Sequence, residues 1–187
     1  MDLKEVKKLL GIEFSLIYDA VNPIIKNLNL DKDSKILDVG TGSGRMAITL
    51  AFNGFSILTG EPDDDISEYA KRDWLKNAKK VNVDHLITFT PFHAEKMPFN
   101  DEEFDAVFIM GALHHIDNKK AALEESVRVI KSGGVICVIE PSKKMLHFIK
   151  KEIPTHPDIV DPRDFAVNLS VEYIKGEFFN SFIIKKQ

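Results

Sequence analysis

The sequence of 187 residues contains a single cysteine, Cys137, so no disulfide can form within the chain. One cysteine suits the reducing cytoplasm, where thiols stay reduced. No apolar run approaches the roughly 20 residues that a membrane-spanning helix needs. The first residues, Met1–Glu5, lack the apolar core of a signal peptide. These absences predict a cytoplasmic protein that does not enter a membrane.

The chain also lacks the excess of positive charge that a nucleic-acid surface needs. Lys and Arg number 25 against 29 Asp and Glu, and the formal net charge is −4. Because phosphate contacts require a basic surface, nucleic acid is disfavoured as the main partner. The hydrophobic content of 44% and the length allow one domain, residues 1–187, with a substantial core. Composition leaves open whether the chain forms a homo-oligomer.

The sequence does have a glycine-rich turn between two apolar segments. A β-branched run, Ile36–Val39, precedes it, and a helical pattern, Met46–Phe52, follows it. Between them, glycine occupies the alternate positions 40, 42 and 44. Because glycine has no Cβ and a helix N-terminus offers unpaired N–H donors, a ligand can approach the backbone of such a turn. The pattern predicts a site for a nucleoside-like cofactor.

The spacing of the glycines argues against two common nucleotide sites. The dinucleotide fingerprint needs Gly or Ala where this chain has Arg45, because helix and strand pack closely there. A phosphate-binding loop needs Gly-Lys-Ser/Thr, which the sequence does not contain. The remaining pattern, Asp38-x-Gly-x-Gly-x-Gly, resembles motif I of the class I S-adenosylmethionine-dependent methyltransferases.

Four later segments resemble further signatures of this family, in the family's order. They are Ala94–Phe99 ("A-E-x-L-P-F"), Phe104–Ile109 ("F-D-x-V"), Ala112–Ile116 ("L-H-H") and Arg128–Gly134 ("R-V-L-K-P-G-G"). The resemblance runs from about Ser34 to the C-terminus. It implies a Rossmann-like, doubly wound α/β fold with seven mostly parallel strands, a terminal antiparallel hairpin and S-adenosyl-L-methionine as cofactor. Residues 1–33 would be an N-terminal helical cap and residues 34–187 the cofactor-binding core.

The hydrophobic pattern predicts a similar architecture, because strand-like and helix-like runs alternate and imply a parallel sheet with helices on both faces. Two helical stripes, 2–10 and 13–28, come first; Gly11 should end one, and Pro23 should kink or divide the other. Strands are expected near 35–39, 55–60, 86–90, 104–109 and 134–140, helices near 44–53, 65–80, 118–130 and 142–152, a loop at 153–164, and a hairpin of Val171–Ile174 and Phe178–Ile184.

The turn and the second strand supply the predicted cofactor contacts. Asp38 would brace the turn and face the methionine end of the cofactor. Glu61 lies 21 residues after Gly40, at the end of a strand, where a carboxylate can accept both ribose hydroxyl protons. The acidic run after it suits a helix start, with Asp64 or Asp65 as N-cap. The predicted contacts of the turn and strand are Asp38, Gly40, Thr41, Gly42, Ser43, Gly44 and Glu61.

The resemblance adds positions around the adenine. It places Ile66 where the family has a methionine that packs on the adenine ring. Many relatives carry Asp, bonded to the adenine amino group, where this chain has His93. The backbone of Ala94 or the side chain of Glu95 is expected to take over that contact. Met110, after the fourth strand, completes the predicted cofactor set.

Catalytic and substrate residues are expected at the carboxyl edge of the sheet, where open α/β folds bind ligands. His114 and His115 could act as a general base or orient a substrate; the alternative is a structural role in capping and packing. Two adjacent histidines do not make a metal site, and no third ligand has an obvious spacing, so no metal is predicted. Cys137 is predicted to be a small hydrophobic side chain buried in a strand. Candidate substrate contacts are Glu140, Asp161, Arg163 and Phe165.

The activity implied is direct transfer of the sulfonium methyl, leaving S-adenosyl-L-homocysteine. The chain lacks the Asn/Asp-Pro-Pro-Tyr/Phe motif, a Pro-Cys loop and an added basic domain, so a small-molecule acceptor is favoured by elimination. Two alternatives stay open. One is a methyltransferase that acts on protein or RNA with a partner subunit. The other is a non-catalytic cofactor-binding protein of the same fold.

Overall fold

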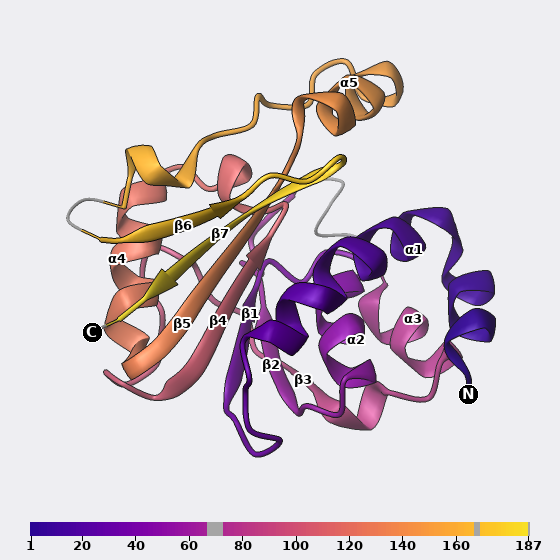
Figure 1. Ribbon diagram of the computed structural model, residues 1–187, viewed down its shortest axis with the longest axis horizontal. Helices are drawn as coiled ribbons and strands as arrows, with labels where there is room; N and C mark the ends of the chain where they lie inside the picture. Colours follow the sequence, from indigo (N-terminus) through magenta and orange to yellow (C-terminus); the bar gives the residue numbers. More distant parts are fainter. Residues whose placement is uncertain (67–72, 167–168, 187) are drawn as a thin grey trace. The chain divides into compact units, whose positions relative to one another are not determined.

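The computed structural model describes residues 1–66, 73–166 and 169–186 (Figure 1). The chain divides into two compact units, Met1–Phe92 and His93–Gln187. Among the described residues, no helix combines the length and apolar character needed to cross a membrane. The division into a helical cap and a cofactor-binding core stays a prediction.

The sheet has seven strands in the order β3-β2-β1-β4-β5-β7-β6. In the first unit β1 pairs with β2, and β2 with β3, in parallel. In the second unit β4 and β5 are parallel, whereas β7 runs antiparallel to both β5 and β6. The predicted fold class, a mostly parallel sheet ending in an antiparallel hairpin, is therefore confirmed.

Among its described residues, the first unit contains three α-helices and three strands. Its long N-terminal helix is broken at Gly11 (φ 86°, ψ −174°), as the sequence predicts, but continues through Pro23 without leaving helical φ/ψ. The buried face around Val21 and Ile24 holds that helix in place although proline removes one hydrogen bond. The elements are α1 (Leu3–Asn27), β1 (Ile36–Val39), α2 (Arg45–Phe52), β2 (Ile57–Gly60), α3 (Trp74–Lys80) and β3 (Ile87–Phe89).

The helix predicted over 65–80 is shorter at its start. Asp65 and Ile66 are not helical, and residues 67–72 lie outside the described residues. Helix α3 begins at Trp74, and its N-cap is Asp73, whose side chain accepts a hydrogen bond from the backbone N–H of Lys76 at 2.8 Å. Asp64 and Asp65 therefore do not cap α3. A carboxylate three residues before a first-turn N–H satisfies that donor directly, which the earlier acidic run cannot do for α3.

In the part of the second unit that the structure describes, the chain forms the remaining strands and two α-helices. Its strand β5 begins earlier than expected, at Ile130, because Ile130 pairs with Phe104 before an irregularity and Val135 pairs with Ala106 after it. The hairpin of β6 and β7 is confirmed and is the yellow ribbon of Figure 1. The elements are β4 (Phe104–Met110), α4 (Lys119–Val129), β5 (Ile130–Pro141), α5 (Lys143–Glu152), β6 (Val171–Ile174) and β7 (Phe179–Lys185).

Close packing at the end of β2 gives a first testable prediction. A Cβ on Gly60 would lie 2.0 Å from the carbonyl oxygen of Thr90 and 2.4 Å from the ring of Phe92. Because a backbone carbonyl cannot move aside cheaply, Gly60→Ala should lower the free energy of unfolding by about 3 kcal/mol or more. Urea unfolding followed by circular dichroism measures the change.

The control for this substitution is Gly54→Ala. An added Cβ at Gly54 would meet no atom within 4 Å, although its φ of +88° is unfavourable for alanine. That variant should lose only the strain of the backbone, about 1–2 kcal/mol. Equal losses for the two variants would contradict the close approach of Thr90 to Gly60.

Candidate active site

The glycine turn after β1 has a backbone that favours glycine at each of its three positions. Gly40, Gly42 and Gly44 have φ values of +89°, +49° and +78°. At Gly44, which caps α2, a Cβ would also lie 3.0 Å from the Cβ of Trp74. The glycines are therefore needed for the shape of the turn, and the predicted strand, turn and helix start are confirmed.

Polar groups from β2 and α3 hold this turn in place. The carboxylate of Glu61, just after β2, accepts a hydrogen bond from the N–H of Gly42 at 2.7 Å. The N–H of Gly40 donates to the carbonyl of Gly60 at 2.9 Å. From α3, the side chain of Asn77 donates to the carbonyl of Ser43 at 3.0 Å. Sequence reasoning missed Asn77, because a polar residue on a short helix carries no signal of its long-range partner.

Asp38 lies beneath the turn and is fully buried. Its Oδ2 accepts a hydrogen bond from the hydroxyl of Thr59 at 2.8 Å, and the hydroxyls of Thr59 and Thr41 are 3.0 Å apart. Its Oδ1 has no hydrogen-bond partner among the described residues. The predicted bracing role fits this network, and the second oxygen remains available to a ligand donor.

Burial controls the charge of Asp38. Desolvation raises its pKa from 3.8 to about 7, the hydrogen bond from Thr59 opposes this rise, and the nearby charge of Glu61 adds to it. The carboxyl group therefore titrates close to neutral pH in the folded protein. A donor or a positive charge placed next to Oδ1 would favour its ionised form.

Of the predicted adenine contacts, Ile66 belongs to the first unit and the other residues belong to the second. Ile66 is 88% exposed, so its packing on an adenine ring stays a prediction. His93 forms a one-residue bridge with Lys96, and the Ala94 beside it is buried. The carboxylate of Glu95 accepts a hydrogen bond from the N–H of Asn118, the N-cap of α4, at 3.3 Å. Met110, half-buried, ends β4.

The two candidate catalytic histidines differ sharply in exposure. The side chain of His114 is 1% exposed, and its Nδ1 lies 2.5 Å from Oε2 of Glu140, which is equally buried. His115, on the same 3₁₀ turn (Leu113–His115), is exposed. The rings of the two histidines are 4.2 Å apart between centroids. Glu140, predicted to contact substrate, is therefore held by His114.

A third histidine that sequence reasoning missed lies beside this pair. The ring of His156 is 5.1 Å from that of His114 and 5.0 Å from that of His115. His156 is buried, and this burial lowers its pKa. It lies in the loop after α5, 41 residues from His115, and no recognisable spacing links the two histidines.

Two of the other candidate substrate residues, Asp161 and Arg163, form an ion pair. The guanidinium of Arg163 donates to both carboxylate oxygens of Asp161, at 2.9 and 2.6 Å, which raises the pKa of Arg163 and lowers that of Asp161. Arg163 also lies 4.8 Å from the ring centre of Tyr173 in β6. These contacts attach the 3₁₀ turn at Pro162–Asp164 to the hairpin of β6 and β7. A role for this pair, or for the half-buried Phe165, in substrate binding stays a prediction.

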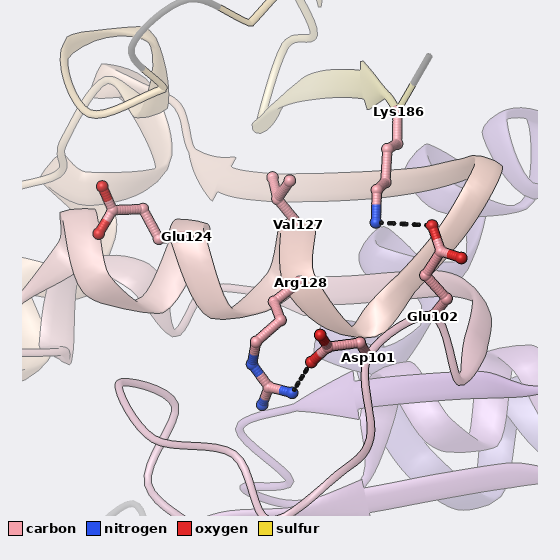
Figure 2. Close-up of a pocket in the computed structure, with 6 residues that line it drawn as sticks. All are labelled: Asp101, Glu102, Glu124, Val127, Arg128 and Lys186. Carbon is pink, nitrogen blue, oxygen red and sulfur yellow. Dashed lines mark hydrogen bonds and ion pairs between the residues drawn. The ribbon is translucent and has the colours of Figure 1, made fainter.

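A surface pocket of about 510 Å³ in the second unit is separate from these histidines (Figure 2). Two ion pairs line it: Arg128 with Asp101 at 2.8 Å, and Lys186 with Glu102 at 3.3 Å. Arg128 also donates to the carbonyls of Phe99 and Met97. Because its charges are already paired, this pocket offers little to a ligand, and its contacts serve to hold the 97–102 segment.

Comparison with known proteins identifies the family. The model of the family described as "Methyltransferase domain" matches residues 37–138, more than half of the chain. The chain belongs to this family. The matched stretch includes the glycine turn, Glu61 and the two adjacent histidines.

Individual relatives within the methyltransferases are consistent with this assignment. The chain is 33% identical, over 132 residues, to the ubiquinone/menaquinone biosynthesis C-methyltransferase UbiE of Rickettsia massiliae. It is 27% identical over 128 residues to the demethylmenaquinone methyltransferase of Clavibacter sepedonicus. These alignments cover 67% and 68% of the chain but only 50% and 49% of the relatives. The chain thus spans about half the length of the curated relatives it matches.

A solved structure confirms the fold. The crystal structure of a putative S-adenosyl-L-methionine-dependent methyltransferase from Methanococcus maripaludis is similar to this chain, with a TM-score of 0.73. The similarity covers 98% of this chain and 90% of the other, at 23% sequence identity. The shared architecture is the Rossmann-like methyltransferase fold.

Replacement of the buried carboxyl group gives a second prediction. Folding raises the pKa of Asp38 to about 7, so the folded state holds a proton that the unfolded state releases above pH 4. Stability from this group is therefore present at low pH and is lost as pH rises through 7. Between pH 5 and pH 8 the wild type should lose about 3 kcal/mol from this group. Asp38→Asn should remove that loss.

The measurement is the free energy of unfolding of both proteins in urea at several pH values. Other groups titrate in both proteins, so the difference between the two curves isolates Asp38. The variant should gain stability relative to the wild type as pH rises from 5 to 8. A difference independent of pH would show that Asp38 does not titrate in this range.

Proposed function

We propose that the protein is an S-adenosyl-L-methionine-dependent methyltransferase that acts on a small molecule. One observation carries this proposal: a glycine turn at a helix start, held by a carboxylate at the end of the neighbouring strand. The N–H of Gly42 and the carboxylate of Glu61 are 2.7 Å apart, so a ligand on the turn also meets the carboxylate. Family membership supports the same cofactor.

The described residues fit the chemistry of this cofactor. The backbone of Gly40–Gly44 would contact its methionine portion, and the buried Oδ1 of Asp38, which has no partner among the described residues, would accept a hydrogen bond there. Glu61 would accept the ribose hydroxyls, because a carboxylate at the end of the second strand takes this role in nucleotide-binding folds. The contacts proposed for Ile66, His93, Ala94, Glu95 and Met110 rest on the family resemblance.

The bound cofactor supplies a methyl group already activated by a positive sulfonium. The work of the protein is then to align the acceptor atom with that methyl and to exclude water. A base is needed only where the acceptor must lose a proton. Of the two candidate histidines, His115 is exposed and accessible to an acceptor, whereas His114 is buried against Glu140.

The names of the relatives support a small-molecule acceptor. Those of Rickettsia massiliae and Clavibacter sepedonicus are named for quinone methylation, although this chain spans half their length. The net charge of −4 agrees with an acceptor other than nucleic acid. A cytoplasmic location, consistent with one buried cysteine, stays part of the proposal.

Cofactor binding by wild type and by Glu61→Ala tests the proposal. Isothermal titration calorimetry with S-adenosyl-L-methionine and S-adenosyl-L-homocysteine should show both ligands binding to the wild type. Loss of a charged acceptor should weaken binding by about 1.5–3 kcal/mol, roughly 10- to 150-fold. A screen of small-molecule acceptors, followed by detection of S-adenosyl-L-homocysteine, then tests methyl transfer.

The matched control is Asp63→Ala, which removes an exposed carboxylate two residues from Glu61. Its affinity for both ligands should equal that of the wild type. Wild-type protein that binds neither ligand at high micromolar concentration would contradict the proposal. Binding without transfer to any acceptor would favour the cofactor-binding protein that does not catalyse.

A further inference from the structure

Three histidines from two separate segments converge at one point of the second unit. His114 and His115 lie on the 3₁₀ turn that follows β4, and His156 lies in the loop that follows α5. One ring nitrogen of each lies within 4.8 Å of one nitrogen of the other two. Imidazole is the side chain that most commonly binds transition metals, so three in one place require an explanation beyond packing.

The hydrogen bond to the carboxylate of Glu140 determines the tautomer of His114. Glu140 Oε2 lies 2.5 Å from Nδ1 of His114, so Nδ1 carries the proton and donates it. The other nitrogen, Nε2, then carries no proton and has a lone pair that can accept a hydrogen bond or bind a metal ion. It is buried and has no hydrogen-bond partner among the described residues. A buried acceptor without a donor is costly, and a metal ion would satisfy it.

A backbone carbonyl determines the tautomer of His156 in the same way. Its Nδ1 lies 2.8 Å from the carbonyl oxygen of Pro157, which can only accept a hydrogen bond. Nδ1 is therefore the protonated nitrogen, and Nε2 presents its lone pair. Metal-binding histidines characteristically donate the second ring N–H to a carboxylate or a backbone carbonyl. His114 donates in this way to the carboxylate of Glu140, and His156 donates to the carbonyl of Pro157.

We propose that His114, His115 and His156 form a binding site for a divalent transition metal ion, with Zn²⁺ as the best match. Three imidazoles and a fourth position left to water or a ligand are the donor set of open zinc sites. Glu140 lies behind His114 and offsets part of the metal charge. The site lies at the carboxyl ends of β4 and β5, the edge where α/β sheets bind ligands.

Metal binding requires a small closure of the three rings. Zinc–nitrogen bonds of about 2.0–2.1 Å put tetrahedral ligand atoms nearer than 4.8 Å. His114 and His156 are buried, whereas His115 is exposed on a short turn, so the ring of His115 is the one with room to rotate inward. We therefore expect His115 to complete the site when the ion binds.

Direct metal titration of the untagged 187-residue chain tests this proposal. Calorimetry with Zn²⁺ should show one ion bound per chain, and Co²⁺ should develop the visible absorption of a four-coordinate site. His115→Gln and His156→Gln should each weaken Zn²⁺ binding at least tenfold. Glu140→Gln should weaken it by about 10- to 100-fold, because it removes the carboxylate behind His114.

The matched control is His147→Gln, which replaces an exposed histidine of α5 outside the cluster and should bind Zn²⁺ as the wild type does. Because His115 is exposed, its replacement should leave the fold intact, which circular dichroism checks. Absence of Zn²⁺ binding by wild type at high micromolar concentration would overturn the proposal. So would unchanged affinity in both His115→Gln and His156→Gln. Neither result depends on cofactor binding, so the proposed methyltransferase activity is tested separately.

Discussion

The hydrogen bond from the Gly42 N–H to the Glu61 carboxylate fixes the geometry on which the candidate active site depends. It connects the turn after β1 to the end of β2 at 2.7 Å. A turn of three glycines with positive φ would otherwise have wide conformational freedom, because glycine has no Cβ. The carboxylate restrains it from β2, and Asn77 restrains it from α3. The turn is thus preorganised, which reduces the entropy that a ligand must offset on binding.

Beneath the turn, a buried carboxyl group is retained at a cost to stability. Asp38 has one oxygen bonded to Thr59 and one without a partner among the described residues, and burial raises its pKa to about 7. A leucine or asparagine at this buried position would cost less desolvation free energy than a carboxyl group. The carboxyl group is therefore best explained by a ligand that donates to it. In the second unit, Nε2 of His114 and the second carboxylate oxygen of Glu140 are likewise buried without a hydrogen-bond partner among the described residues.

Local patterns in the sequence predicted most of the fold, including the glycine turn after β1. The strand, glycine turn and helix at 36–52 could be predicted because each depends on neighbouring residues. The helix at 65–80 was placed too early, since Asp73 rather than the acidic run caps α3. His156 and Asn77 could not be predicted, because their partners lie far along the chain and neither residue type signals such a partner. The absence of a third histidine at short spacing led to the expectation of no metal, although the fold brings one to the pair.

Nuclear magnetic resonance tests most directly whether the glycine turn and Glu61 form the cofactor site. Protein labelled with ¹⁵N-glycine contains ten glycines. Of these, Gly40, Gly42 and Gly44 report on the turn, and Gly11 and Gly54 report on other parts of the first unit. Titration with S-adenosyl-L-homocysteine should shift the three turn amides most, and Gly42 above all if Glu61 turns toward the ribose. Shifts confined to other glycines, or no shifts at saturating ligand, would contradict the account.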